Sequence, residues 1–133
     1  MFCRIIDGRE PAWVVYEDDD TIAFLDSMPI APGHILVCPK QHAARLSEME
    51  DGIGPLNEAL AKVARLVEER VSSDYNIGAN QGARAGQVVF HHHWHVIPRR
   101  AGDPREWERE RLTEAGARAV FKELGIEPVR RRG

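Results

Sequence analysis

Short apolar segments separated by turn residues occupy the first third of the chain. Residues 12–16 (AWVVY) and 21–26 (TIAFLD) have the length and content of β-strands, and the acidic run at 17–20 between them is typical of a solvent-exposed turn. A third such segment, 34–39 (HILVCP), follows a loop marked by Pro29, Pro32 and Gly33. The pattern predicts a hairpin followed by a third strand.

Two segments have helical spacing. Between residues 55 and 71, apolar side chains recur every three or four positions, and Pro55 suits the first turn of a helix. Residues 113–124 repeat this spacing, and Gly125 and Pro128 are expected to end the second helix. The arginines at 130–132 are expected to form a frayed basic end rather than an anion contact.

Strand-like segments return between the two helices. Residues 74–80 predict a short strand, residues 81–87 a loop bracketed by Gly82 and Gly86, and residues 88–98 one long strand. We therefore predict an α+β fold with a mostly antiparallel sheet of about five strands and two main helices. The 133 residues fit a single domain, in which residues 2–100 carry the motifs and residues 101–133 form the C-terminal helix and tail.

The predicted strand 88–98 places histidines together, because alternate side chains of a strand point to opposite faces. His91, His93 and His95 would lie in a row on one face, each about 7 Å from the next. The other face is apolar apart from one buried histidine and is expected to pack into the core. It carries Val88, Phe90, His92, Trp94 and Val96.

Three imidazoles in a row have two chemical uses. Neutral imidazole is a common metal ligand, and with an ordinary pKa of about 6.5 it also serves as a nucleophile or acid–base catalyst. The histidine face carries no carboxylate, and the glycine-bounded loop before it can direct backbone N–H groups and the Gln87 amide at an anion. These features favour phosphate chemistry over metal-dependent hydrolysis, and a solvent-exposed histidine cluster remains an alternative.

Composition narrows the function classes. All six histidines lie within residues 34–42 or 91–95, which directs the search for a site to these segments. The formal net charge of −3 gives no general attraction to nucleic acid or to an anionic membrane, and no apolar run approaches the roughly 20 residues that span a bilayer. Two cysteines make no disulfide framework and the N-terminus lacks a secretion signal, so we expect a cytoplasmic protein.

Four ordered blocks of the chain resemble the histidine triad family. Residues 16–18 with 23–26 resemble its first hairpin, 32–42 its second block, and 76–82 the segment before its glycine loop. Residues 86–99 resemble its motif His-φ-His-φ-His-φ-φ, where φ is apolar, although His92 stands at an apolar position. The resemblance covers roughly residues 2–100. It is closest to the Hint-like branch or its bacterial relatives, with the fragile-histidine-triad branch as the alternative.

The resemblance implies catalytic roles for four histidines. His93 would attack the α-phosphorus of a nucleotide and form a transient nucleotidyl-histidine. His95 would contact the phosphate and help to protonate the leaving group. His91 would support the geometry, and His34 would complete a relay. The sequence leaves open how these residues divide the proton transfers.

The resemblance also implies how the substrate is held. Asp26 would accept hydrogen bonds from the ribose hydroxyls, and Asn80 and Gln87 would bind phosphate oxygens. Phe24 and Ile5 would form an apolar pocket for a purine base. The alternatives are a strand-ending carboxylate at Asp26, a turn residue at Asn80, and ordinary core positions for the two apolar side chains.

The implied activity is that of a nucleotide hydrolase or nucleotidyl transferase. It would act on a purine nucleoside phosphoramidate or a related AMP-like compound, as a homodimer, without a cofactor and without a nucleic acid partner. A dinucleoside polyphosphate hydrolase, a metal-dependent hydrolase and a non-catalytic nucleotide-binding regulatory protein are the alternatives.

The family also raises the question of zinc. Some bacterial relatives bind structural zinc through a Cys-x-x-Cys pair and two histidines. In this chain Cys3 matches only the second cysteine, and His42 matches one of the histidines. Because a closed zinc site of this kind takes two thiolates, we expect no metal.

Overall fold

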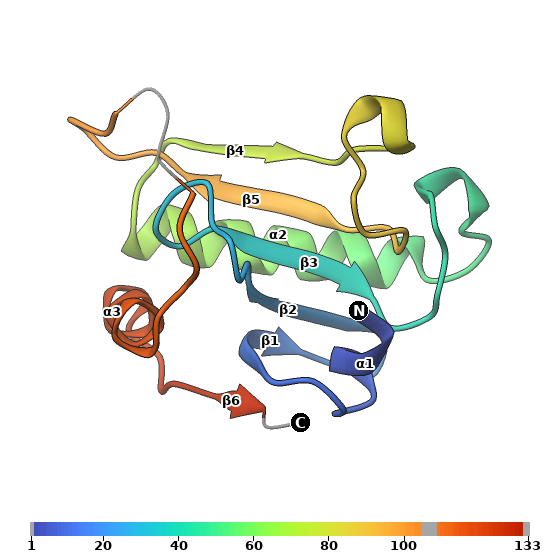
Figure 1. Ribbon diagram of the computed structural model, residues 1–133, viewed down its shortest axis with the longest axis horizontal. Coiled ribbons are helices and arrows are strands. Elements are labelled where there is room, and N and C mark those ends of the chain that lie inside the picture. The colour runs from blue at the N-terminus through green and yellow to red at the C-terminus, as the bar shows by residue number, and fades with distance from the viewer. Residues whose placement is uncertain (1, 105–108, 132–133) are drawn as a thin grey trace.

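A central antiparallel sheet organises the computed structural model, which describes residues 2–104 and 109–131 (Figure 1). Within these ranges the sheet has six strands in the order β4-β5-β3-β2-β1-β6. The strands are β1 (Ala12–Glu17), β2 (Thr21–Leu25), β3 (Ile35–Pro39), β4 (Tyr75–Gly78), β5 (Trp94–Pro98) and β6 (Arg130–Arg131). The helices are α1 (Phe2–Ile6), α2 (Ile53–Arg70) and α3 (Glu114–Leu124), with 3-10 helices η1 (Leu46–Glu48) and η2 (Ala83–Ala85).

The predicted α+β architecture is confirmed. Every neighbouring pair of strands is antiparallel, and the two predicted helices are α2 and α3. Thr113 caps α3, because its Oγ1 accepts a hydrogen bond of 2.9 Å from the backbone N–H of Gly116. The prediction omitted α1 and β6. None of the helices in the described ranges combines the length and apolar character needed to cross a membrane.

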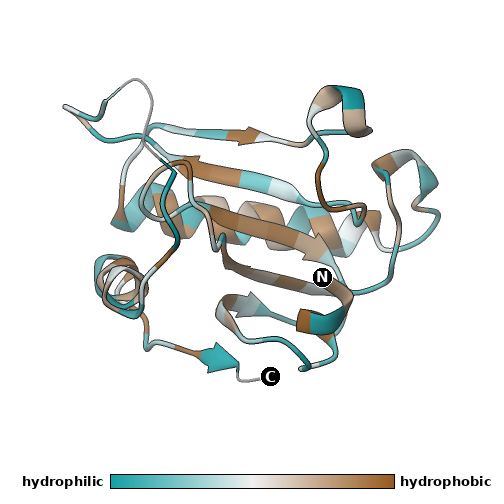
Figure 2. Ribbon diagram, in the orientation of Figure 1, coloured by the Kyte–Doolittle hydropathy of each residue, from teal (hydrophilic) through white to brown (hydrophobic). Residues whose placement is uncertain are grey.

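Both faces of the central strands are buried. Helix α2 runs behind the sheet in Figure 1, and with α3 it forms a core cluster that includes Ala23 and Val37. Phe24 and Leu36 belong to a second cluster on the opposite face, which α1 covers. Because both faces are covered, β2 and β3 are continuous apolar runs, brown in Figure 2, rather than alternating ones.

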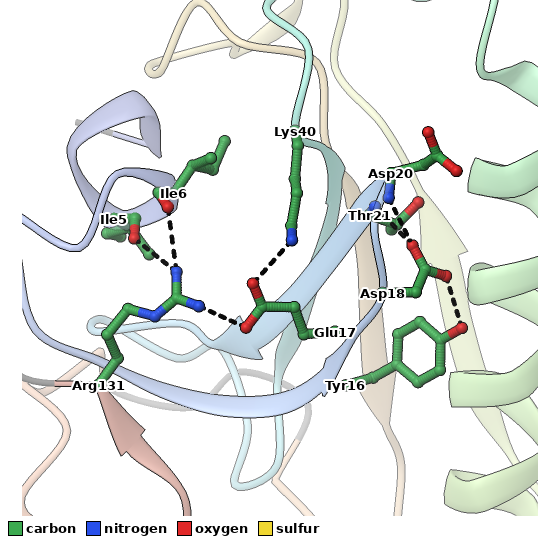
Figure 3. Close-up of polar contacts among 9 residues, drawn as sticks. All are labelled: Ile5, Ile6, Tyr16, Glu17, Asp18, Asp20, Thr21, Lys40 and Arg131. Carbon is green, nitrogen blue, oxygen red and sulfur yellow. Dashed lines mark hydrogen bonds and ion pairs between the residues drawn. The ribbon is translucent and has the colours of Figure 1, made fainter.

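The acidic run after β1 is an ordered turn. Oδ1 of Asp18 accepts hydrogen bonds of 2.8 Å from the backbone N–H groups of Asp20 and Thr21, and Oδ2 accepts one of 2.6 Å from the Tyr16 hydroxyl (Figure 3). A short carboxylate stabilises a turn by accepting such local N–H groups. The predicted hairpin is therefore confirmed, and Asp18 is the residue that closes it.

The C-terminal strand corrects the expected frayed end. β6 pairs with β1, and the Arg131 guanidinium donates to the carbonyl oxygens of Ile5 (3.0 Å) and Ile6 (3.1 Å) at the end of α1. It also forms an ion pair with Glu17 (Figure 3). Arg131 finds these partners because the last turn of a helix leaves carbonyl groups unpaired and β1 offers an open edge. Arg132 lies outside the described residues.

The long strand predicted at 88–98 is wrong for its first half, because β5 begins only at Trp94. Val37 of β3 pairs with Trp94. If the ladder continued for two more residues, Pro39 of β3 would lie opposite His92. Pro39 has no backbone N–H to donate to the ladder. The N–H of His92 donates to the carbonyl of Ala43 at 2.6 Å instead, and residues 88–93 follow an irregular path.

The alternation of side chains fails in the same segment. Val88 and Phe90, which the sequence assigns to the core, are 84% and 53% exposed. His92 is buried as predicted, and its Nδ1 lies 3.2 Å from Nε2 of Gln81. Burial lowers the pKa of His92 to about 4, with the neighbouring histidines adding to the effect, so this ring is neutral near pH 7.

Candidate functional site

A cavity of about 830 Å³ opens on the α1 side of the sheet. Its walls come from α1, β2 and the following loop, β4, β5 and the chain from residue 109 onward. It is lined by six of the predicted site residues: Ile5, Phe24, Asp26, Asn80, His93 and His95. His34, His91 and Gln87 lie outside this lining. The cavity therefore unites the predicted base pocket, ribose carboxylate and two histidines of the triad.

The protonation of the His93 ring is fixed by its backbone neighbour. Nδ1 of His93 lies 2.8 Å from the carbonyl oxygen of His91. A carbonyl only accepts hydrogen bonds, so Nδ1 carries the proton and Nε2 carries the lone pair. The rings of Phe2 and His95 pack edge-on against His93, with centroids 4.9 Å and 4.8 Å away. The neutral His93 ring thus carries its lone pair on Nε2, and its side chain lines the cavity.

His95 has the opposite tautomer, because a chain of hydrogen bonds orients it. The backbone N–H of Ile30 donates to Nδ1 of His34 at 3.0 Å, which leaves the His34 proton on Nε2. That Nε2 lies 2.8 Å from Nδ1 of His95 and donates to it. The proton of His95 therefore sits on its own Nε2. His95 lines the cavity as a hydrogen-bond donor beside the lone pair of His93.

Burial keeps this relay neutral. It lowers the pKa of His34 to about 3 and that of His95 to about 4, and the positive charge of Arg109 adds to both effects. Near pH 7 both rings are uncharged, which agrees with the hydrogen-bond directions above. An anion in the cavity would raise the pKa of His95, because a nearby negative charge favours the imidazolium form.

His91 supports the site from outside the cavity. Its Nε2 donates to the carbonyl oxygen of Pro39 at 2.7 Å, and its own carbonyl orients His93. Nδ1 of His91 therefore carries a lone pair, and burial lowers the pKa of this ring.

Asp26 contributes a partly shielded carboxylate at the end of β2. Oδ1 accepts a hydrogen bond of 2.9 Å from the backbone N–H of Met28. Oδ2 lies 3.5 Å from Nδ1 of His34 and 3.6 Å from Nη2 of Arg109. Burial raises the pKa of Asp26, and the Met28 N–H and the charge of Arg109 oppose this effect. Asp26, His34 and His95 are close enough to bind a metal ion, but both ring nitrogens of His34 are occupied by hydrogen bonds.

The glycine loop brings Asn80 but not Gln87 to the cavity. Nδ2 of Asn80 donates to the carbonyl of Gly86 at 3.4 Å, and the side chain lines the cavity. The Gln87 amide is buried. Its Oε1 accepts from the N–H of Gly82 at 2.8 Å, and its Nε2 donates to the carbonyl of Ala44 at 2.7 Å. In this structure Gln87 holds the loop in shape rather than facing an anion.

The apolar wall is an aromatic corner on α1 and β2. The rings of Phe2 and Phe24 meet edge-to-face at 5.3 Å, and Ile5 lies in the same cluster. These side chains are buried and also line the cavity, so the core and pocket interpretations both apply to them. Because Arg131 holds the end of α1, the C-terminal strand fixes this wall.

Cys3, His42 and His91 form a second cluster beside the cavity. Sγ of Cys3 lies 3.5 Å from Nδ1 of His42 and 3.6 Å from Nδ1 of His91, and the two nitrogens are 3.2 Å apart. Tetrahedral zinc would hold two nitrogens about 3.3 Å apart and a nitrogen and a sulfur about 3.6 Å apart. The donor set therefore fits zinc with a fourth ligand still to be supplied, although the sequence favoured no metal.

Sequence reasoning missed Arg109. The residue lines the cavity beside Asp26, but it follows the triad at a distance and carries no local motif. Only the return of the chain over the loop after β2 brings it to the site.

Known proteins resemble this chain in sequence. The HIT domain family model matches residues 7–102. The chain is 44% identical to an uncharacterised HIT-like protein of Methanocaldococcus jannaschii. That alignment spans 125 residues and covers 93% of this chain and 97% of that protein. The chain is 40% identical over 106 residues to an adenosine 5′-monophosphoramidase of Candida albicans, with coverage of 75% and 70%. It is 37% identical over 105 residues to an adenylylsulfatase of Arabidopsis thaliana, with coverage of 77% and 53%.

Solved structures agree with this similarity. A HIT-like protein from Bartonella henselae superposes with a TM-score of 0.84 and 32% identity, covering 92% of this chain and 91% of that one. A zinc-bound histidine triad family protein from Mycobacterium smegmatis has a TM-score of 0.79 and 35% identity, with coverage of 93% and 91%. The arrangement of the sheet and helices therefore belongs to a fold that has been observed experimentally.

Proposed function

Because this chain belongs to the HIT domain family, we propose that it is a nucleotide hydrolase or nucleotidyl transferase that attacks the α-phosphate of a purine nucleotide compound with His93. The observation that carries the proposal is the pair of opposite tautomers in one cavity, a lone pair on Nε2 of His93 and a proton on Nε2 of His95. The adenosine 5′-monophosphoramidase and the adenylylsulfatase among the relatives support a substrate that carries an AMP group.

The first step forms the covalent intermediate. The anionic phosphate favours the imidazolium form of His95, which carries protons on both Nδ1 and Nε2, and the Nε2 proton is the transferable one. In this form Nδ1 of His95 donates to Nε2 of His34, and the His34 proton moves to its own Nδ1, 3.5 Å from Oδ2 of Asp26. Nε2 of His93 attacks the α-phosphorus, the bond from phosphorus to the leaving group breaks, and the leaving atom takes that proton from His95. The products are a neutral His95, the protonated leaving group and a nucleotidyl-His93.

The second step releases the nucleotide. Water attacks the phosphorus, its proton passes to His95, and the electrons of the phosphorus–nitrogen bond return to Nε2 of His93. Throughout both steps the carbonyl of His91 holds Nδ1 of His93 and His34 holds Nδ1 of His95. The ring positions are set before the substrate binds, which reduces the reorganisation needed in the transition state.

The remaining wall residues suit the nucleoside. Phe24, Ile5 and Phe2 form an apolar surface for the base, and a purine buries more area there than a pyrimidine. Asp26 is the acceptor for the ribose hydroxyls, and Asn80 is a donor for a phosphate oxygen.

A substrate panel tests this function. We expect turnover of an adenosine phosphoramidate, with a kcat/KM about tenfold or more above that of its 2′,3′-dideoxy analogue, because Asp26 loses its hydroxyl partners in the analogue. Equal values would remove Asp26 from the ribose site. A strong preference for a diadenosine polyphosphate would indicate the fragile-histidine-triad activity instead. Tight AMP binding without turnover of any compound would indicate a regulatory nucleotide-binding protein.

The chemistry is expected to proceed without a metal. Zinc held by Cys3, His42 and His91 would supply a fixed positive charge and a cross-link between α1 and the histidine segment, which is a stabilising role. We expect turnover to persist in excess chelator. Added zinc should raise the Tm of the wild type but not that of His42→Ala, measured by differential scanning fluorimetry. Joint loss of one zinc per chain and of activity would contradict this.

A homodimer is the expected assembly. β4 is an edge strand, and Ile77 on it and Val88 nearby are 43% and 84% exposed, while both line the cavity rim. A second copy would cover these apolar side chains. Sedimentation should give twice the chain mass of 15.0 kDa, and Ile77→Glu should shift it toward the monomer, while Val129→Glu should not. A wild-type monomer at micromolar concentration would refute the dimer. The cytoplasmic location and the lack of a nucleic acid partner stay predictions.

A further inference from the structure

The chain after β5 returns across the loop that follows β2 and closes one end of the cavity. Nε of Arg109 donates to the carbonyl oxygen of Met28 at 2.9 Å, and Nη2 donates to the same oxygen. The backbone N–H of Leu112 donates to the carbonyl of Ser27 at 2.8 Å. Arg109, Met28 and Leu112 all line the cavity. Residues 109–112 are therefore a strap, fixed by hydrogen bonds to the segment that begins with Asp26.

The strap places a cation beside the less constrained oxygen of Asp26. Oδ1 is engaged by the N–H of Met28. Oδ2 faces Nη2 of Arg109 at 3.6 Å and Nδ1 of His34 at 3.5 Å. His34 offers no proton there, because its Nδ1 accepts from the N–H of Ile30. Arg109 is thus the cationic side chain that faces Oδ2 from the strap.

A carboxylate in this position needs a compensating charge. Burial raises the pKa of Asp26, while the hydrogen bond from the Met28 N–H and the positive charge of Arg109 lower it. An ionised carboxylate accepts hydrogen bonds at both oxygens, whereas a protonated one loses part of this capacity. Arg109 favours the form that can accept from two neighbouring hydroxyl groups.

We infer that Arg109 is a positioning residue that sets the sugar preference of the cavity, by holding Asp26 as an ionised and oriented acceptor for the 2′- and 3′-hydroxyls of a ribonucleoside. This inference rests on the proposed nucleotide site. Arg109 lies beyond residues 7–102, the part that matches the HIT domain.

If Arg109 only stabilised the fold, its removal would lower the Tm and leave the preference for ribose over dideoxyribose unchanged. The inference predicts the opposite pair of results. The Arg109 side chain is 49% exposed, and exposed ion pairs contribute little to the stability of a fold. Its removal should leave the Tm nearly unchanged and should alter the discrimination between ribose and dideoxyribose. Arg118 is a matched control, because it is an exposed arginine that pairs with Glu114 on α3 and does not itself line the cavity; its guanidinium lies over Trp13, 5.5 Å from the ring centroid.

The test compares AMP with 2′,3′-dideoxy-AMP as ligands of the full chain, by calorimetry at pH 7. We expect the wild type and Arg118→Gln to bind AMP about tenfold more tightly than the dideoxy form. Arg109→Gln should lose most of this ratio while keeping its affinity for dideoxy-AMP, and Arg109→Lys should retain part of it. Asp26→Asn should remove the ratio, and adding Arg109→Gln to it should change nothing further.

The outcomes separate the inference from the function on which it rests. An unchanged ratio in Arg109→Gln would overturn the inference and leave the nucleotide site intact. Equal loss of affinity for both ligands would also overturn it, because it would mean that Arg109 contacts the phosphate or supports the whole pocket. A wild type that binds neither ligand would defeat the proposed function itself, and the sugar-preference inference with it.

Discussion

Replacement of His93 by alanine is expected to lower kcat/KM by about a thousandfold or more while AMP still binds. The substitution removes the Nε2 lone pair that attacks phosphorus, so the covalent route is lost and only positioning by the cavity remains. The ring lines the cavity without being its main apolar wall, so nucleotide affinity should change little. Steady-state kinetics and AMP binding by calorimetry measure the two quantities separately.

The matched control is His42→Ala. His42 is exposed and lies outside the cavity lining, so turnover should remain near the wild-type rate. Near-wild-type turnover in a folded His93→Ala protein would remove His93 as the nucleophile. Loss of turnover together with loss of AMP binding would indicate a role in substrate binding instead.

Replacement of His95 by alanine is expected to cost a hundredfold to about ten-thousandfold for a substrate with an amine leaving group, the usual range for loss of a positioned acid–base group. The cost should shrink markedly for an adenylyl compound whose leaving group departs readily as an anion, because such a group needs no proton. The measurement is kcat/KM for both substrates in the wild type and the variant.

Replacement of His34, the side chain that orients His95, tests the same proton transfer from the other side. His34→Gln can place an amide near Nδ1 of His95, so it should retain more activity than His34→Ala. An equal loss for both leaving groups in His95→Ala would show that His95 stabilises the phosphate rather than protonating the leaving atom.

Local patterns in the sequence were enough to predict much of the fold. The hairpin from residue 12 to 25 follows from apolar runs around a turn that Asp18 closes, and α2 follows from helical spacing. The strand at 88–98 failed because its length depends on a partner. Its neighbour β3 ends in Pro39, which cannot continue the ladder, and no pattern within residues 88–93 carries that information.

The candidate site also combines residues that a local motif reveals with contacts that depend on distant segments of the chain. His93 and His95 could be proposed from the sequence because they are close in sequence and belong to a recognisable motif, and both line the cavity. The assignment of Gln87 to phosphate binding could not anticipate that Gly82 and Ala44 would occupy its amide. These are contacts between segments, and only the folded chain defines them.

Contacts between residues far apart in the sequence explain why the zinc-like cluster and the role of Arg109 were not predicted. Cys3 and His91 are 88 positions apart, so thiolate counting alone could not reveal a donor set with zinc-like distances. Arg109 meets Met28 across 81 positions. The family resemblance had pointed to Cys3 and His42 as two zinc ligands, but neither their distances to His91 nor the position of Arg109 could be inferred before the sheet and the returning strap brought these residues together.

The most direct measurement is capture of the covalent intermediate. The wild type, mixed with an adenosine phosphoramidate, is quenched by rapid denaturation under alkaline conditions, where a phosphorus–nitrogen bond to histidine persists, and the peptides are mapped by mass spectrometry. We expect an adenylyl group on His93, formed as fast as the first turnover and absent from His93→Ala. An adenylyl group on another residue, or product formed in a single turnover with no adduct at any time, would contradict attack by His93.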